Sequence, residues 1–364
     1  IDLSAPLRQG IGLGVYNPKE FFKAFWHMHG FATSQKKYDK FFNALKSTEE
    51  YHIMTQSGLS ITNTTGKADA REDVFMNKLA KKIPIYGIFY KGSERAYSGF
   101  LNMLRIDVFN KGVEHLKLQG ITFEENPEQY EALARTINNA TGRGELGATG
   151  EKIARELGLV FFSPRMLTSR VGMVSDIFRP DTPKYARTVA FGNAIGLASY
   201  IMTIHALGAL IMSAADDEEK GVTFKEVMEK LSFNIIDTDF LKNTYPGKNT
   251  KGETTKYDFS TGFSILLRTI ARMSVGKKIV RSRRTGEKEE RSLRDGGAYR
   301  ESGADEFSQF IKNKLSPTAR VIYSLPVFAN QDLEDYKEKF EWGTALKSLV
   351  VPLNVKEALG EDNF

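Results

Sequence analysis

Residues Thr188 to Ala215 read TVAFGNAIGLASYIMTIHALGALIMSAA, a run of 28 positions without Asp, Glu, Lys or Arg. A helix needs about 20 apolar residues, each with a rise of about 1.5 Å, to cross a hydrocarbon core about 30 Å thick. Charges mark both ends of the run, because Lys184 and Arg187 precede it and four acidic residues follow it from Asp216. We therefore expect one long apolar helix, for which any functional interpretation has to account.

Two environments are compatible with this helix. Gly192 and Gly196 form a Gly-x-x-x-Gly pair, a spacing that lets two helices approach closely, especially in membranes. Asn193 and His205 favour a protein environment, because each polar side chain adds an insertion cost at bilayer depth. A lipid-contacting helix and a buried central helix both stay open. Gly192, Gly196 and His205 are the candidate membrane-contact or helix-packing residues.

The rest of the composition is that of a water-soluble protein, with 364 residues, 41% hydrophobic, 26% charged and a net charge of +6. The length allows two or three domains with sizeable cores. The basic balance fits contact with nucleic acid or an anionic membrane surface without requiring either. The absence of cysteine excludes disulfides, thiol nucleophiles and cysteine-ligated metal sites. Because the chain begins at Ile1 and shows no signal peptide, we expect a piece or processed product of a longer protein.

Apolar periodicity and helix-start signals predict the individual helices. The expected helices begin at Asn17-Pro18 and cover 35–45, 93–118, 127–140, 188–215, 223–233, 262–275, 305–314 and 332–349, with another over 152–173 that is interrupted or restarted at Pro164. A basic β-hairpin is expected from 280–284 and 288–292 around Thr285-Gly286. Loops are expected at Gly10 to Gly14 and at Gly58 to Gly66.

The predicted fold is mainly α and multi-helical, with a long central apolar helix and one small β-hairpin. A glycine-rich break at 142–150 separates the first domains. We predict an N-terminal helical segment over 1–84, a helical domain over 85–150, an apolar-helix region over 151–260 and a C-terminal helical region with the basic hairpin over 261–364.

No motif in the chain specifies catalysis. The glycines from Gly10 to Gly14 resemble a phosphate loop only superficially, because neither Gly-Lys-Ser/Thr nor a strand–turn–helix context follows. His27 and His29 lie two positions apart on a predicted helix and so cannot clamp a metal together. A glutamate-based hydrolase stays open, since paired carboxylates need not be close along the chain. We predict no enzymatic activity, no catalytic residues, no cofactor and no metal.

The densest basic block lies between Lys277 and Arg294. Its candidates for contact with nucleic acid are Lys277, Lys278, Arg281, Arg283 and Arg284. The block contains no aromatic residue, whereas sites for single-stranded nucleic acid usually add stacking rings. A solvated hairpin and a non-specific phosphate contact are the two interpretations.

Several short phrases occur in a fixed order along the chain. They are ERAY with FLNMLR and Phe109 (94–109), INNATGRG (137–144), FFSPR with Ser169-Arg170 (161–170), and KNKLSP (312–317) after the Thr285-Gly286 turn. This ordered set, from Ile85 to Thr318, resembles the conserved C-terminal region of the large polyvalent proteins of tailed bacteriophages and related mobile elements. The segments before 85 and after 320 match nothing in that family.

The resemblance implies a part of a very long phage protein that is packaged in the virion as cargo, with DNA delivery into the host as a suggested role. The implied partners are portal, tail or internal virion proteins, copies of the chain itself, phage DNA bound without sequence preference, and the host membrane during infection. The implied location is the virion interior or portal vertex, then the host envelope or cytoplasm after ejection. The family offers no catalytic residues to carry over.

Three functions therefore stay open from the sequence. The first is a non-enzymatic structural or ejection-related segment of a virion-associated protein. The second is a membrane-active conduit module for genome delivery, which differs in whether Thr188 to Ala215 ever contacts lipid. The third, disfavoured because no site supports it, is a cell-wall or nucleic-acid enzyme.

Overall fold

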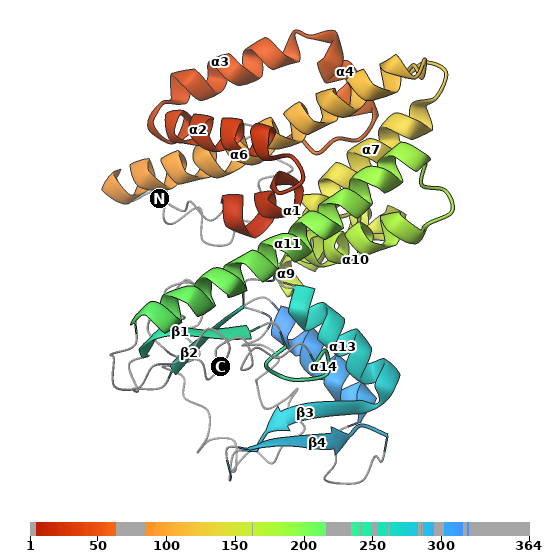
Figure 1. The fold of residues 1–364 in the computed structure, drawn as a ribbon. Coiled ribbons are helices and arrows are strands. Elements are labelled where there is room, and N and C mark those ends of the chain that lie inside the picture. The colour runs from red at the N-terminus through yellow and green to blue at the C-terminus, as the bar shows by residue number, and fades with distance from the viewer. Residues whose placement is uncertain are drawn as a thin grey trace. The chain divides into compact units, whose positions relative to one another are not determined.

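The computed structural model is mainly helical, with one long apolar helix and small antiparallel strand pairs (Figure 1), which confirms the predicted fold class. The structure describes residues 5–62, 84–161, 163–215, 234–240, 242–248, 254–258, 260, 263–282, 285, 287–294, 302–315 and 319. For 84–90, 211–215, 242–248, 254–258 and a few single positions, 281 among them, it describes the backbone alone. The helices predicted over 223–233 and 332–349 lie outside the described residues.

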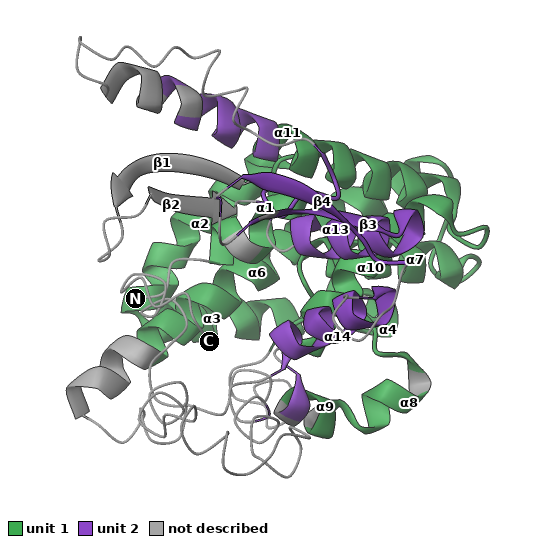
Figure 2. Cartoon of the chain, turned by 90° about the horizontal axis from the view of Figure 1, so that it is seen from below, with its two compact units in different colours: residues 1–158, 163–200 green, residues 159–162, 201–364 purple. Residues whose placement is uncertain are grey.

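The chain divides into two compact units, which Figure 2 colours separately. The first unit comprises Ile1–Gly158 and Ser163–Tyr200, and the second comprises Leu159–Phe162 and Ile201–Phe364. This division differs from the four predicted regions, 1–84, 85–150, 151–260 and 261–364. Helices from both sides of residue 85 share one apolar core. Packing between distant segments therefore joins regions that were predicted to be separate from the glycine and proline residues between them.

The helices that the structure describes from the N-terminus onward are η1 (Pro6–Gly10), α1 (Ile11–Gly14), α2 (Pro18–Thr33), α3 (Gln35–Lys46), α4 (Glu49–Gln56), α6 (Pro84–Leu118), α7 (Pro127–Ala140), α8 (Gly147–Lys152), α9 (Ala154–Val160), α10 (Pro164–Phe178) and α11 (Lys184–Ala215). Helix α11 begins in the first unit and continues into the second. Pro18, Pro127 and Pro164 start α2, α7 and α10, where the fixed φ of proline suits the first helical position.

The core of the first unit is built around α6. Helix α2 lies along α6 (Figure 1) and buries Ala24, Met28 and Phe31 in the apolar cluster that also contains Phe100 and Leu104 of α6. These α2 positions follow the spacing of a helix whose apolar side faces a neighbour. The side of α2 away from α6 is left for solvent.

The predicted loop at Gly10 to Gly14 is wrong, because η1 and α1 are helical there and the three glycines are buried. A Cβ atom on Gly12 would lie 2.8 Å from the carbonyl oxygen of Ala140, and one on Gly14 would overlap the ring of Phe21. The glycines therefore serve close packing between elements rather than freedom of the backbone.

The second unit contains β1 (Lys242–Lys248), β2 (Thr254–Asp258), α13 (Phe263–Val275), β3 (Lys277–Arg281), β4 (Lys288–Ser292) and α14 (Gly303–Lys314). The predicted hairpin is β3 and β4, which pair antiparallel from Lys277 opposite Ser292 to Arg281 opposite Lys288. Its first strand lies three residues earlier than predicted. The pair β1 and β2 is a second antiparallel sheet, for which no strand was predicted from the sequence.

Candidate functional site

Three of the phrases that carried the resemblance meet in one place in the first unit. There α6, α7 and α10 bring together a set of buried polar side chains that we call the polar junction: Asn102, Arg105, Asn138, Asn139, Thr141, Ser169, Arg170 and Asp176. A buried polar group is costly unless it is hydrogen-bonded, so the partners of this set decide what the junction does.

Arg105 is the largest of these side chains and is completely buried. Its Nε donates to Oγ1 of Thr141 at 2.7 Å, and its Nη2 donates to the carbonyl of Thr141 at 3.2 Å. Its Nη1 donates to the carbonyl of Ser60 at 3.1 Å. One guanidinium group therefore ties α6 to the end of α7 and to the segment after α4.

That segment, residues 58–62, is held by two asparagine amides and is called here the strap. Asn102 accepts a hydrogen bond from the backbone N–H of Thr62 at 2.9 Å and donates to its carbonyl at 2.7 Å. Asn138 accepts from the N–H of Ser60 and donates to the carbonyl of Gly58, both at 2.9 Å. Each amide presents a donor and an acceptor side by side, as a neighbouring strand would. Residues 58–62 form a loop as predicted, but Leu59 and Thr62 are buried, so the predicted exposure is wrong there.

Asp176 joins α10 to α7. Its carboxylate is buried and accepts from Nε of Arg135 at 3.0 Å and from Nδ2 of Asn139 at 2.7 Å. A Cβ atom at Gly172, one turn earlier on α10, would come within 2.5 Å of the Asn139 amide, so this helix contact requires a glycine. Gly144 plays a similar part, because a Cβ there would overlap the backbone of Ser169.

Arg170 lies on the same helix and is almost fully buried, and burial lowers its pKa to about 10. The hydrogen bonds of Asn102, Arg105, Asn138, Asn139 and Asp176 go to backbone groups and to neighbouring helices of this chain. The geometry of the polar junction therefore holds the helices and the strap in position. Within the described residues, no group of three or more His, Asp or Glu side chains could hold a metal ion.

The small-residue pair on α11 packs inside the first unit. A Cβ atom on Gly192 would lie 2.5 Å from the ring of Tyr16, and one on Gly196 would lie 3.2 Å from the backbone nitrogen of Tyr16 and 3.3 Å from Cβ of Val15. The face that the sequence offered for contact with another copy is thus occupied by the turn after α1. His205 is completely buried nine residues further along α11, in the part that belongs to the second unit.

Another side of α11 carries exposed apolar residues. We call Phe191, Ile195 and Met202 the α11 stripe, because their spacing of four and seven residues places them on one side of the helix and all three are about half exposed. Lys184–Gly208 is long and apolar enough to cross a membrane by length and composition, and 44% of that span is buried. A buried soluble helix passes the same test, so length and composition do not decide between protein and lipid.

The structure accounts for the charge of the basic hairpin. Lys277 pairs with Glu290 across the strands at 2.7 Å, Lys288 pairs with Asp237 at 2.6 Å, and Arg291 pairs with Glu289. Lys278 is buried and its ammonium group lies 3.3 Å from the carboxylate of Glu306. Lys278 is therefore corrected from a candidate phosphate contact to a structural residue. Arg283, Arg284 and the side chain of Arg281 lie outside the described residues.

Lys278 of the hairpin belongs to a group that was not predicted from the sequence. We call this group, Arg272, Lys278 and Glu306, the ionic cluster. Nη1 of Arg272 donates to Glu306 at 2.5 Å, and its Nε donates to the carbonyl of Ile236 at 2.8 Å. Burial by itself raises the pKa of Glu306, but the hydrogen bond and charge of Arg272, with the charge of Lys278, hold it below its usual value. The sequence signal was the pair of basic residues, Arg268 and Arg272, on a helix rich in apolar residues.

No protein-family model, no curated protein and no solved structure matches this chain. The resemblance to large polyvalent phage proteins therefore stays a prediction, as do the implied partners and location.

Proposed function

We propose that this chain is a non-enzymatic structural segment of a bacteriophage virion-associated protein, packaged in the capsid or near the portal and related to DNA ejection. The observation that carries the proposal is α11, which packs one face inside the first unit and leaves the α11 stripe exposed. Exposed apolar area costs about 25 cal/mol per Å² relative to burial, so this stripe favours a partner in an assembly.

The polar junction supports the structural role in this proposal. The phrases ERAY–FLNMLR, INNATGRG and SPR–SR, on which the resemblance rests, supply all of its residues except Asp176, and those residues hold helices together. What this chain would share with the phage family is therefore a set of fold-making side chains rather than a catalytic constellation.

Packaging of the chain in the virion is tested by mass spectrometry of purified phage particles produced by the genome that encodes the chain. Peptides from both units are expected in particles after nuclease and protease treatment, because packaged proteins are shielded by the capsid. A chain that is abundant in infected cells but missing from particles would overturn the assignment.

Assembly through the α11 stripe is tested with a triple variant, Phe191→Ser, Ile195→Ser and Met202→Ser. If the α11 stripe is an assembly surface, light scattering during size-exclusion chromatography should show association of the wild-type chain that the variant loses. The matched control replaces Val171, Val174 and Phe178, three exposed apolar residues of α10, with serine. Equal association of the stripe variant and the wild type would contradict the proposal.

The proposed absence of enzymatic activity is tested separately. We expect no turnover of peptidoglycan, nucleic acid or nucleotides by the purified chain. Turnover that disappears on a single substitution among its residues would show an enzyme and end this part of the proposal.

A conduit module that enters the host membrane is the second candidate, and the length and apolar composition of Lys184–Gly208 favour it. In that case the wild-type chain should float with liposomes of pure phosphatidylcholine and stay bound in high salt, and the stripe variant should not. Association between copies without flotation would leave the structural function in place and remove the conduit.

A further inference from the structure

The outer side of α2 carries aromatic residues that the fold of the first unit does not use. Trp26 is 78% exposed, Phe22 is 67% exposed and Phe25 is 36% exposed, and together they form what we call the aromatic ridge. The opposite side of α2 already supplies the core through Met28 and Phe31. An apolar patch of this kind, rimmed by polar residues, marks a surface for a partner or a membrane.

Two rings of the ridge, Phe22 and Phe25, rest on Phe21. The ring of Phe21 packs edge-on against Phe100 of α6, with centroids 5.4 Å apart, and stacks with Phe25 at 6.5 Å. It also meets Phe22 edge-on at 5.7 Å. Rings that are already held in place lose little conformational entropy when they bind.

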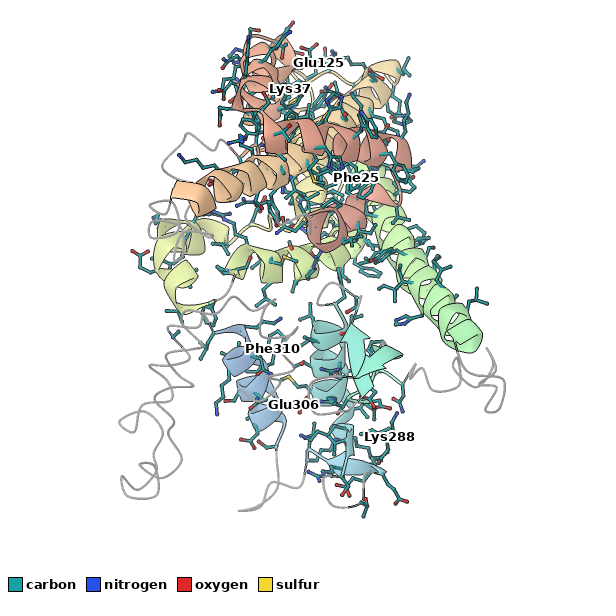
Figure 3. All side chains as sticks on the ribbon, turned by 90° about the vertical axis from the view of Figure 1, so that its left-hand side faces the viewer. Phe25, Lys37, Glu125, Lys288, Glu306 and Phe310 are labelled. Carbon is teal, nitrogen blue, oxygen red and sulfur yellow. The ribbon has the colours of Figure 1, made fainter. Side chains whose placement is uncertain are left out.

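Lysines border the ridge. Lys19 is exposed on the first turn of α2, and Lys37 of α3 lies against Gly30, with its Cδ 3.6 Å from where a Cβ would stand. Figure 3 shows Phe25 and Lys37 on these two helices. From Pro18 to Lys46 the chain has six lysines, all exposed, against two acidic residues, Glu20 and Asp39. Lys23 pairs with Asp107 of α6 at 3.0 Å, and the other five lysines still outnumber these acidic residues, so the surface around the ridge carries a net positive charge.

We propose that the aromatic ridge docks on the surface of an anionic lipid bilayer, with its rings at the level of the headgroups. Tryptophan and other amphipathic rings favour that zone, and lysines beside it gain energy from anionic lipids. The ridge stands on the convex side of a helix, so it can enter an interface without a matching groove. This surface belongs to α2 and α3 and is independent of the α11 stripe.

Tryptophan fluorescence tests the proposal directly, because the chain has two tryptophans, Trp26 and Trp342. In a Trp342→Phe background the emission reports Trp26 alone. Vesicles that contain phosphatidylglycerol should shift this emission to the blue. Vesicles of pure phosphatidylcholine should bind the chain roughly 25-fold more weakly, since two lysine charges contribute about fivefold each.

Two variants test whether the effect lies on the ridge. Phe22→Ser in the same background should weaken vesicle binding roughly tenfold, and the double variant Lys19→Gln and Lys37→Gln should remove most of the preference for anionic lipid. The controls are Phe178→Ser, an equally exposed ring on α10, and Lys117→Gln, an exposed lysine at the end of α6. Circular dichroism confirms that each variant is folded. The triple serine variant of the α11 stripe should keep the Trp26 shift.

Other occupants of the ridge give different results, and each overturns the proposal. A blue shift that grows with protein concentration in the absence of vesicles identifies a second copy. A shift produced by single-stranded oligonucleotide but not by vesicles identifies nucleic acid. Binding that Phe22→Ser leaves unchanged shows that lipid contact, if present, lies elsewhere.

Discussion

The polar junction of the first unit and the ionic cluster of the second both bury an arginine, but the two arginines have different acceptors. Arg105 donates to a hydroxyl and to backbone carbonyls, next to a large apolar core. Arg272 donates to the carboxylate of Glu306, which also pairs with Lys278. The acceptors of Arg105 are neutral and do not titrate, whereas the ionic cluster depends on one carboxylate staying ionised.

Arg272→Met should have the largest effect on stability and should confine it to the second unit. Removing one partner from a buried ion pair leaves an uncompensated charge, which costs about 3–5 kcal/mol. Hydrogen exchange read by mass spectrometry should show lost protection in α13 and α14 and unchanged protection in α6 and α7. Arg291→Met is the control, because its pair with Glu289 is exposed and contributes about 1 kcal/mol or less.

Gly144→Ala should destabilise the first unit by about 1–3 kcal/mol, since the added methyl group would overlap the backbone of Ser169 in a packed region. Urea unfolding followed by circular dichroism measures the change. Gly158→Ala on α9 is the matched control, with nothing within 4 Å of the new atom, and it should be neutral or slightly stabilising. Equal stability of Gly144→Ala and the wild type would show that the junction tolerates separation of its helices.

Asn193→Leu should stabilise the protein by about 1–2 kcal/mol. Asn193 is completely buried on α11, and neither its Oδ1 nor its Nδ2 has a hydrogen-bond partner among the described residues. A buried polar group without a partner carries its full desolvation cost. A higher melting temperature is expected for Asn193→Leu than for the exposed control Ala198→Leu. A loss of stability would indicate that Asn193 bonds to a residue outside those described.

The smallest expected effect is a pH dependence of opposite sign in the two units. The pKa of Glu306 is lowered in the folded chain, so its stabilising contribution is present above the ordinary value of 4.5 and is lost as the pH falls through the folded pKa. Burial raises the pKa of Asp107 on α6, although Lys23 partly offsets this. The penalty on the ionised Asp107 is therefore relieved as the pH falls through its folded pKa and is gone below the ordinary value of 3.8.

Melting curves of Glu306→Gln and Asp107→Asn between pH 7 and pH 3.5 test these signs. The stability difference between wild type and Glu306→Gln should shrink as the pH falls. Between wild type and Asp107→Asn, the wild type should gain relative to the variant over the same range. Parallel pH profiles for both variants would contradict the contrast between the units.

The starts of several helices and the long apolar helix were determined by the sequence alone. Pro18, Pro127 and Pro164 begin helices because a fixed φ and a missing N–H act on the residues next to them. Ser302 and Asp305 form a capping box at the start of α14 for the same local reason. Thr188 to Ala215 is helical as predicted, because no charged or helix-breaking residue interrupts it.

Only the tertiary structure decided which side chains the interior uses. The glycines at positions 10, 12 and 14 are typical of a loop by composition. They are helical because Phe100, Ala140 and Phe21 pack closely against them. Lys278 stands in a basic run like its neighbours, and the position of Glu306, 28 residues away, is what buries it. Local signals reach about one helical turn, whereas burial and charge pairing depend on partners that the chain brings together only when it folds.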